Sequence, residues 1–474
     1  MPQRRVRLVP PDAAPVAEAF VQLRDDLDVS LGFPDDVVAE ARESARSPRL
    51  PAADETAIPF VTIDPPESRD LDQALHLERR GGGYRVRYAI ADVAAFVAPG
   101  GPLDREAHAR GETLYAPDAN ARLYPPKLSE SAASLLADET RPALVWTFEL
   151  DSHGEEAGVD VRRALVRSRA QLDYETVQRS LDDGTAEESL LLLREVGPLL
   201  QEREAARGGV DLPIPDQEVE RTDAGYELTW RAPLPVEGWN AQISLLTGRA
   251  AARLMLDARL GVLRTLPQAD PFGIARLRRA AGALGVPWPE GRSHAEFVRT
   301  LDPEVPAHAA VLAETTVLFR GSGYRAFDGE APAGAQHAGV GAPYTHATAP
   351  LRRLLDRYVG EVCVAAAAGD PVPPWAREAL PELPETMKES NRRAQQYNGG
   401  IVSIVEAAVL SRSVGQVFDA VVVEVDEDGG GVVQLADPAV SARCAGDDLP
   451  LGERIDARLT DADVAKRLVR FERA

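Results

Sequence analysis

The sequence predicts an α+β protein that begins with a short helical element and ends in a small β-barrel. Its 474 residues are too many for one average hydrophobic core, and 44% of them are apolar, so two or three domains are expected. Residues 16–48 have helical spacing, whereas the middle of the chain mixes helical and β patterns. Beyond about residue 411, short β runs alternate with Gly and Asp turns, which predicts the terminal barrel.

The first elements follow from local patterns. Residues 16–48 contain a Pro-Asp-Asp start at Pro34, so we expect two or more helices there. Residues 58–64 form a short β run that ends before Pro65 and Pro66. Because proline cannot continue a β ladder, this run places Asp64 at the end of a strand.

A β-hairpin and a series of helices are predicted after the first strand. Residues 74–79 and 84–93 flank a Gly-rich turn, and the second run alternates between apolar and other residues, which predicts a half-buried hairpin. Pro371 to Pro384 is expected to be a loop. Helices are expected at residues 173–183, 187–207 and 243–260 and around 290–320 and 350–367.

Charge and composition exclude several classes of function. The chain has 53 basic and 75 acidic residues and a net charge of −22, which argues against a general polyanion binder or an anionic membrane partner. No window has the apolar length of a membrane span, and the first residues lack a signal-peptide core, so a cytoplasmic protein is expected. Cys363 and Cys444 are far apart in the sequence and form no ligand-like pair, which predicts buried thiols rather than a disulfide or zinc site.

An acidic cluster follows the first predicted strand. The segment TIDPPESRDLDQ places Asp64, Asp70 and Asp72 within nine positions. Three carboxylates in one small site repel one another unless a cation neutralises them, and oxygen ligands without nearby Cys or His favour Mg²⁺ or Mn²⁺ over zinc. In an extended segment Asp70 and Asp72 face one way, and the intervening loop allows Asp64 to fold back. On spacing alone, a solvated acidic turn or helix cap remains an equal alternative.

Four motifs in order carry a resemblance to a known family. The segments VTIDPPESRDLDQAL, YAIADVAAFV, LYPPKLSESAASLLADETRPAL and YTHATAPLRRLLDR resemble the catalytic domain of the ribonuclease II family of exoribonucleases. The resemblance implies three parts: a helical N-terminal element at 1–54, an RNB-type catalytic domain at 55–405 and an OB-type RNA-binding barrel at 411–474. It also implies processive, Mg²⁺-dependent 3′-to-5′ hydrolysis of single-stranded RNA to nucleoside 5′-monophosphates.

The resemblance also assigns the metal site. Asp64, Asp70 and Asp72 fall on the first three acids of the family motif, which bind the catalytic Mg²⁺ ions, and Mn²⁺ is expected to substitute. Gln73 falls on the fourth position, where an aspartate is usual. Its neutral amide oxygen would hold one of two metals more weakly. The competing interpretation is that Gln73 points away and only hydrogen-bonds or packs.

The RNA contacts are implied in the same way. Arg352 corresponds to the arginine that contacts the scissile phosphate, and Pro350 is expected to open a helix with Arg352 and Arg353 in its first turn. Leu212 stands where an aromatic residue is common. The expected RNA contacts are Tyr115, Tyr174, Gln242, His346 and Arg353, with His337 near the same cleft, although either histidine is equally consistent with a structural role.

The sequence is also compatible with two other functions. A catalytically weakened RNA-binding protein is the first alternative, and an exonuclease acting on single-stranded DNA is the second, because Gln242 replaces a ribose-binding glutamate. The terminal 411–474 segment has 13 acidic and 8 basic residues, so we expect it to bind RNA weakly. The roughly 55 residues before the catalytic motif are too short for the paired barrels usual in the family. We expect a monomer whose partner is single-stranded RNA and not a membrane.

Overall fold

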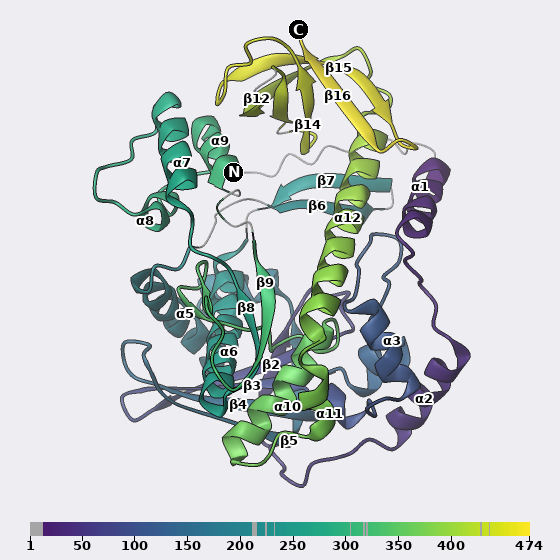
Figure 1. Ribbon diagram of the computed structural model, residues 1–474, viewed down its shortest axis with the longest axis vertical. Coiled ribbons are helices and arrows are strands. Elements are labelled where there is room, and N and C mark those ends of the chain that lie inside the picture. The colour runs from purple at the N-terminus through teal and green to yellow at the C-terminus, as the bar shows by residue number, and fades with distance from the viewer. Residues whose placement is uncertain are drawn as a thin grey trace.

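The computed structural model describes residues 13–474 apart from 211–215, 223–224, 232, 304, 316–317, 319–320, 427–428 and 436. Figure 1 shows a large mixed body, a small terminal barrel above it and the long helix α12 (Leu383–Leu410) running between the two. The predicted α+β class is therefore confirmed.

A closed five-stranded barrel forms the centre of the body. Its strands are β1 (Phe60–Ile63), β2 (Gln73–Arg80), β3 (Gly83–Ala91), β4 (Thr140–Leu150) and β5 (Glu156–Leu172). Neighbouring strands are antiparallel, except that β1 closes the barrel by pairing in parallel with β5. The predicted hairpin is confirmed as β2 and β3. The end of β3 is buried on both faces, unlike a half-buried strand, because helices cover the outside of the barrel.

Some of the remaining helices and hairpins cover this barrel, whereas the hairpin that starts at Asp216 and the helices that start at Pro271, His294 and Pro306 lie beyond it, towards the terminal barrel (Figure 1). The apolar spacing of the sequence predicts many of these helices. The helices of the body are α3 (Pro102–Arg110), α4 (Tyr174–Asp182), α5 (Glu188–Ala206), α6 (Pro235–Ala258), α7 (Pro271–Ala283), α8 (His294–Val298), α9 (Pro306–Thr315), α10 (Leu354–Ala368) and α11 (Pro374–Ala379). The remaining strands pair as β6 (Asp216–Thr222) with β7 (Gly225–Arg231), β8 (Leu260–Thr265) with β9 (Gly323–Asp328), and β10 (Gln336–His337) with β11 (Ala342–Pro343). Short helical turns lie at Val93–Ala95 and Leu128–Ala132.

The predicted N-terminal helices are confirmed as α1 (Ala13–Asp26) and α2 (Asp35–Arg46). The buried side chains of α1 belong to the same hydrophobic cluster as α12 and the terminal barrel. Val37 and Ala41 of α2 belong instead to the main cluster of the body. The two helices are therefore anchored to different parts of the protein.

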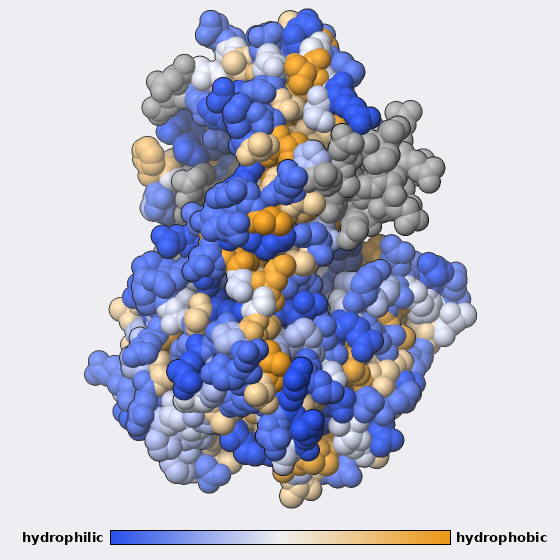
Figure 2. Space-filling view, turned by 90° about the vertical axis from the view of Figure 1, so that its right-hand side faces the viewer, coloured by the Kyte–Doolittle hydropathy of each residue, from blue (hydrophilic) through white to orange (hydrophobic). Residues whose placement is uncertain are grey.

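The predicted terminal barrel is also confirmed. It consists of β12 (Val417–Val425), β13 (Gly431–Leu435), β14 (Val440–Ala445), β15 (Arg454–Asp463) and β16 (Leu468–Arg473), closed in the order β12-β13-β14-β16-β15. Cys363 and Cys444 are buried and free, as expected. Figure 2 shows a mostly hydrophilic face with apolar residues scattered in small groups. Within the described residues, no helix is long and apolar enough to cross a membrane.

The loop expected between Pro371 and Pro384 is only partly a loop. Helix α11 begins at Pro374, and α12 begins one residue before Pro384. A proline in the first turn costs no hydrogen bond, because N–H groups there have no partner within the helix. The prolines that predicted a loop therefore start two helices.

Candidate functional site

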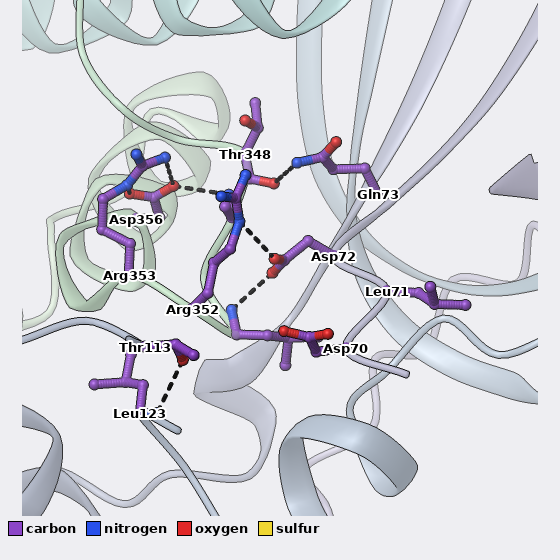
Figure 3. Close-up of polar contacts among 12 residues, drawn as sticks. Asp70, Leu71, Asp72, Gln73, Thr113, Leu123, Thr348, Arg352, Arg353 and Asp356 are labelled. Atoms are coloured by element: carbon purple, nitrogen blue, oxygen red, sulfur yellow. Dashed lines mark hydrogen bonds and ion pairs between the residues drawn. The ribbon is translucent and has the colours of Figure 1, made fainter. Parts of the chain in front are cut away.

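The acidic segment joins the end of β1 to the start of β2. Asp64 follows β1, and its backbone N–H donates to the carbonyl oxygen of Leu172 on β5 at 2.9 Å. Leu71 is fully buried, and the hydroxyl of Ser134 accepts its N–H at 3.0 Å. Figure 3 shows the Leu71 side chain directed away from the carboxylates of Asp70 and Asp72. The barrel thus fixes the backbone on which the three aspartates are placed.

The aspartates affect one another electrostatically. Burial and the nearby charge of Asp70 raise the pKa of Asp64 to about 7, against the opposing effect of Arg352. Burial raises the pKa of Asp72 well above its usual range, and Arg352 again acts in the opposite direction. Asp72 is only 4% exposed. Burial and the repulsion between these carboxylates raise their pKa values, and a bound cation would neutralise the repulsion.

The fit of a divalent cation depends on the donors and on their arrangement. Three carboxylates supply the hard oxygen atoms that Mg²⁺ and Mn²⁺ prefer. In the part of the chain that the structure describes, no three Asp, Glu, His or Cys side chains are grouped so as to hold an ion together. Asp70 accepts a hydrogen bond from Tyr115 and Asp72 one from Leu351. The donor chemistry therefore fits a divalent cation, although the carboxylates of Asp70 and Asp72 are already hydrogen-bonded to protein groups.

A tight turn brings Arg352 to the acidic cluster (Figure 3). The backbone N–H of Leu351 donates to Asp72 Oδ1 at 2.7 Å, and Arg352 Nε lies 3.6 Å from Asp72 Oδ2. The N–H of Ala349 donates to Asp356 Oδ2 at 2.7 Å. The expectation that Pro350 opens a helix is wrong, because α10 begins only at Leu354. Two carboxylates thus accept the N–H groups of Ala349 and Leu351, while the N–H groups of Arg352 and Arg353 donate to the carbonyl oxygen of Ala349, and together these bonds hold the segment as a turn.

The two arginines of this turn have different environments. The side chain of Arg352 is 48% exposed and lies beside Asp72. The side chain of Arg353 is 19% exposed, and it donates to both oxygens of Asp356, at 2.6 and 2.9 Å. The fully buried Asp356 therefore occupies the guanidinium of Arg353. Arg352 is available to an anionic ligand, and the assignment of Arg353 as an RNA contact stays a prediction.

The amide of Gln73 is engaged on both sides. Its Nε2 donates to the carbonyl oxygen of Thr348 at 2.6 Å, and its Oε1 accepts from the hydroxyl of Tyr88 at 2.8 Å. Tyr88 in turn lies 2.8 Å from the hydroxyl of Ser244 on α6. Figure 3 shows the Gln73 amide directed to Thr348. Gln73 thus links the acidic segment to residues 348–353, the turn that carries Arg352 and is called the arginine turn below. Its role as fourth metal ligand stays a prediction.

Tyr115 lies next to the acidic cluster. Its hydroxyl donates to Asp70 Oδ2 at 2.7 Å, while the residue is 42% exposed. Burial and the charge of Asp70 raise the pKa of Tyr115, so the phenol keeps its proton. The loop that follows Tyr115 lines a pocket of about 470 Å³ together with β6 and α12, from which Gln217 and Asn398 contribute amide groups.

Tyr174 and Gln242 differ in their position relative to the site. Tyr174 begins α4, and its hydroxyl accepts from Asn240 Nδ2 at 3.0 Å. Burial raises the pKa of Tyr174, and the charge of Asp64 adds to this shift. Gln242 is 6% exposed on α6 and donates to Glu204 Oε2 at 2.7 Å. Tyr174 is therefore within electrostatic range of the aspartates, whereas Gln242 is bound between α5 and α6. The role of each in RNA binding stays a prediction.

The two histidines lie in an aromatic cluster. His346 Nδ1 is 2.7 Å from the hydroxyl of Tyr324, and burial lowers the pKa of His346 well below its usual value. His337 packs edge-on against Tyr344, and burial lowers its pKa to about 4. Both rings are therefore neutral, which agrees with the structural alternative and leaves RNA contact a prediction. Leu212, where an aromatic residue is common in the family, lies outside the described residues.

The sequence patterns missed several partners in this site. Asp356, Tyr88 and Thr348 hold Arg353 and Gln73 in place, although none belongs to the acidic segment. The alternation in 84–93 predicted that Tyr88 is buried, and Thr348 and Asp356 lie within the motif YTHATAPLRRLLDR, but neither pattern indicated these contacts.

The fold and the site together define an α+β protein with an acidic, arginine-containing site in its large domain and an OB-type barrel at its C-terminal side. Residues 53–367 match the RNB domain, and residues 416–474 match the RNase II-type exonuclease C-terminal S1 domain. The chain therefore belongs to the RNB family, and the resemblance found in its motifs is confirmed.

Known proteins with similar sequences and structures agree with this membership. Ribonuclease R of Escherichia coli (strain K12) is 25% identical over 488 aligned residues, covering 91% of this chain and 58% of the relative. This chain thus spans little more than half of that relative's length. Mycoplasma genitalium RNase R in complex with ribose methylated single-stranded RNA has a TM-score of 0.84 at 17% identity, with 97% of this chain and 78% of that chain covered.

The same fold occurs in a protein described as a pseudonuclease. Yeast Ssd1 has a TM-score of 0.71 at 19% identity, with 88% of this chain and 52% of that chain covered. Likeness at this level of identity establishes the fold alone. Whether this chain hydrolyses RNA is therefore decided by its own side chains.

Proposed function

We propose that this protein is an Mg²⁺-dependent 3′-to-5′ exoribonuclease that hydrolyses single-stranded RNA processively to nucleoside 5′-monophosphates. The observation that carries the proposal is the contact between Asp72 and the arginine turn. It places a half-exposed guanidinium beside the aspartates of the family motif. The match of residues 53–367 to the RNB domain supports the same conclusion.

Asp64, Asp70 and Asp72 would hold the metal, with Gln73 as a neutral fourth ligand and with Mn²⁺ able to replace Mg²⁺. A bound pair of such ions supplies Lewis-acid activation of water and stabilisation of the leaving oxygen. Arg352 binds the scissile phosphate, because a planar guanidinium matches phosphate oxygens whose charge grows during displacement. The fixed turn keeps Arg352 in position and reduces the ordering cost of this contact.

The aromatic residues near the site would hold the RNA strand. Tyr115 is exposed and adjacent to Asp70, and base–aromatic stacking grips single strands without requiring a particular sequence. Tyr174 would contact a ribose near the same end. His346, Arg353 and Gln242 complete the proposed set, although each already has a partner within the protein.

A catalytically weakened RNA-binding protein is the second candidate. Two observations favour it: Gln73 stands in the fourth-acid position, and the carboxylates of Asp70 and Asp72 are bound to protein groups. The likeness to the pseudonuclease Ssd1 shows that the fold does not require hydrolysis. A nuclease for single-stranded DNA is the remaining alternative.

One experiment separates these candidates. Purified protein is incubated with 5′-labelled single-stranded RNA or DNA, with and without Mg²⁺, and the products are resolved as ladders. Mg²⁺-dependent shortening of RNA from the 3′ end is the expected result. Binding of RNA without shortening at any Mg²⁺ or Mn²⁺ concentration would establish the second candidate, and preferential shortening of DNA would establish the third.

A further inference from the structure

The first helix of the N-terminal element reaches the loop that carries Tyr115. Arg24 on α1 is 7% exposed, and its guanidinium donates to both oxygens of Asp118, at 3.0 and 2.8 Å. The same guanidinium lies 3.4 Å from the hydroxyl of Tyr397 on α12. The pKa of Arg24 is raised, mainly because its guanidinium is hydrogen-bonded to Asp118. A partly buried bidentate ion pair therefore connects α1 with residues 115–120.

Helix α1 is a firm support for this ion pair. Val16, Phe20 and Leu23 are each 1% exposed and belong to the cluster shared with α12. Gly400 on α12 leaves the space that Leu23 fills, because a Cβ at Gly400 would lie 2.6 Å from Leu23 Cδ1. Burying three large apolar side chains fixes the helix on α12, so Arg24 is presented from a rigid surface.

The loop itself is short and closed. Leu114 and Ala121 exchange two backbone hydrogen bonds of 2.9 and 2.8 Å across its base. Tyr115 is its first residue, and Asp118 lies three positions further along. Since Tyr115 donates to Asp70 at 2.7 Å, and a hydrogen bond weakens with displacements of a few tenths of an ångström, the loop position determines whether this contact forms.

We propose that Arg24 is a positioning residue, whose bonds to Asp118 hold loop 115–120 so that Tyr115 reaches Asp70 and presents its ring to the 3′-terminal nucleotide of an RNA strand. The same loop forms one wall of the 470 Å³ pocket beside Tyr115, so α1 also sets the shape of the path that the strand takes. This inference rests on the proposed function, because RNA is the ligand on which Tyr115 acts. It gives helix α1 a role in the site.

The test compares Arg24→Met and Asp118→Ala with wild type, using the full chain. Arg24→Met keeps the apolar stem that fills the α1–α12 contact, whereas Asp118→Ala changes only the loop. Both should lower kcat/KM on single-stranded RNA by about tenfold, a loss comparable with that of one base–aromatic stacking contact. Asp26→Asn is the matched control, because Asp26 lies on the same helix but pairs with Arg467 of the terminal barrel; it should leave kcat/KM unchanged.

A double-mutant cycle separates positioning from a general loss of stability. In a Tyr115→Ala background, Arg24→Met should change kcat/KM by less than about twofold, because the group that Arg24 positions is absent. Full additivity of the two losses would overturn the proposal. Fluorescence of a 3′-terminal 2-aminopurine, measured in EDTA so that no cleavage occurs, reports stacking directly. Its quenching on binding should be reduced in Arg24→Met and Asp118→Ala but not in Asp26→Asn.

The outcomes also separate this inference from the proposed function. If wild type binds and quenches the labelled RNA but never cleaves it, the exonuclease assignment fails while the positioning of Tyr115 is still tested by quenching. If wild type cleaves RNA and both variants match it in kcat/KM and quenching, the positioning role is wrong and the exonuclease assignment stands. Absence of RNA binding by wild type would overturn both.

Discussion

The backbone N–H of Leu351 donates to Asp72 Oδ1 at 2.7 Å, across 279 positions of sequence. The donor is a backbone group in a turn that Asp356 also holds through the N–H of Ala349. The position of the neighbouring Arg352 relative to the acidic cluster is therefore set by the backbone and depends little on side-chain rotamers. Asp72 therefore has two roles: its oxygen accepts the N–H of Leu351, and its negative charge lies beside Arg352. A substitution that keeps the oxygen and removes the charge can separate them.

Asp72→Asn is expected to abolish hydrolysis while RNA binding persists. Asparagine keeps the oxygen that accepts from Leu351, so the turn should stay in place, but the negative charge beside Arg352 is lost. We expect the cleavage rate to fall by at least about 100-fold, as when an electrostatic group is removed from a transition state. Gel analysis of 5′-labelled RNA measures cleavage, and fluorescence anisotropy measures binding. Cleavage at the wild-type rate would refute the assignment of Asp72.

The two arginines of the turn should respond differently to substitution. Arg352→Lys keeps a charge but loses the planar fork, so we expect kcat to fall with little change in Tm. Arg353→Ala leaves the buried carboxylate of Asp356 without its charged partner. Removing one member of a buried ion pair costs about 3–5 kcal/mol, so we expect Tm to fall by several degrees.

Thermal unfolding and single-turnover kinetics on both variants check this contrast. An Arg353→Ala protein with unchanged Tm and much weaker RNA affinity would show that Arg353 contacts RNA, as the family resemblance implies. Loss of stability with Arg352→Lys would instead show that Arg352 mainly supports the turn.

Gln73→Asp tests the fourth-ligand proposal. A carbonyl oxygen has two lone pairs, so Gln73 Oε1 can ligate a cation while it accepts from Tyr88. The aspartate variant should lower the Mg²⁺ concentration for half-maximal rate, Gln73→Ala should raise it, and Mn²⁺ should support wild type better than Mg²⁺ does. Rates are measured across a metal titration. Superimposable midpoints for all three proteins would show that Gln73 only bridges Thr348 and Tyr88.

The sequence predicted those features that local patterns determine. The proline stop after Ile63 placed Asp64 at a strand end, and the alternation in residues 84–93 identified a β-hairpin, because each depends on neighbouring residues alone. The helix proposed at Pro350 was wrong for the opposite reason. The N–H of Leu351 is bound by Asp72 and that of Ala349 by Asp356, and the contact with Asp72 exists only in the folded protein.

Contacts between distant segments were also missed in the site. The family motif predicted the three aspartates and Arg352 as site residues, but it gave no indication that Gln73 is bonded to Thr348 or that Arg24 is bonded to Asp118. Those contacts join segments separated by 275 and 94 positions. Net charge did not predict the local charge of the site either. The chain has a net charge of −22, yet Arg352 is half exposed beside Asp72.

Glu406 should make the stability of the protein depend on pH. It is 6% exposed on α12, and its Oε1 accepts from Gln217 Nε2 of β6 at 2.8 Å and from the N–H of Ser441 of the terminal barrel at 3.0 Å. Burial raises the pKa of Glu406, against the lowering effect of these two hydrogen bonds. The folded protein therefore binds a proton at Glu406 more readily than the unfolded chain does.

For a group whose pKa is raised on folding, the stabilising contribution is fully present below the unfolded pKa and is lost as pH rises through the folded pKa. Glu406→Gln stays neutral at every pH and keeps the oxygen acceptor for both hydrogen bonds. Its Tm should therefore equal or approach that of wild type in acid, and the difference in its favour should grow as pH rises above the ordinary range of a glutamate. Other titrating groups are common to both proteins and cancel in this difference.

Glu385→Gln, on the same helix with a side chain that is 65% exposed, is the control and should follow wild type. Calorimetric Tm values between pH 4 and 8 measure the effect, and parallel profiles for wild type and Glu406→Gln would show that Glu406 is not the source of any pH dependence.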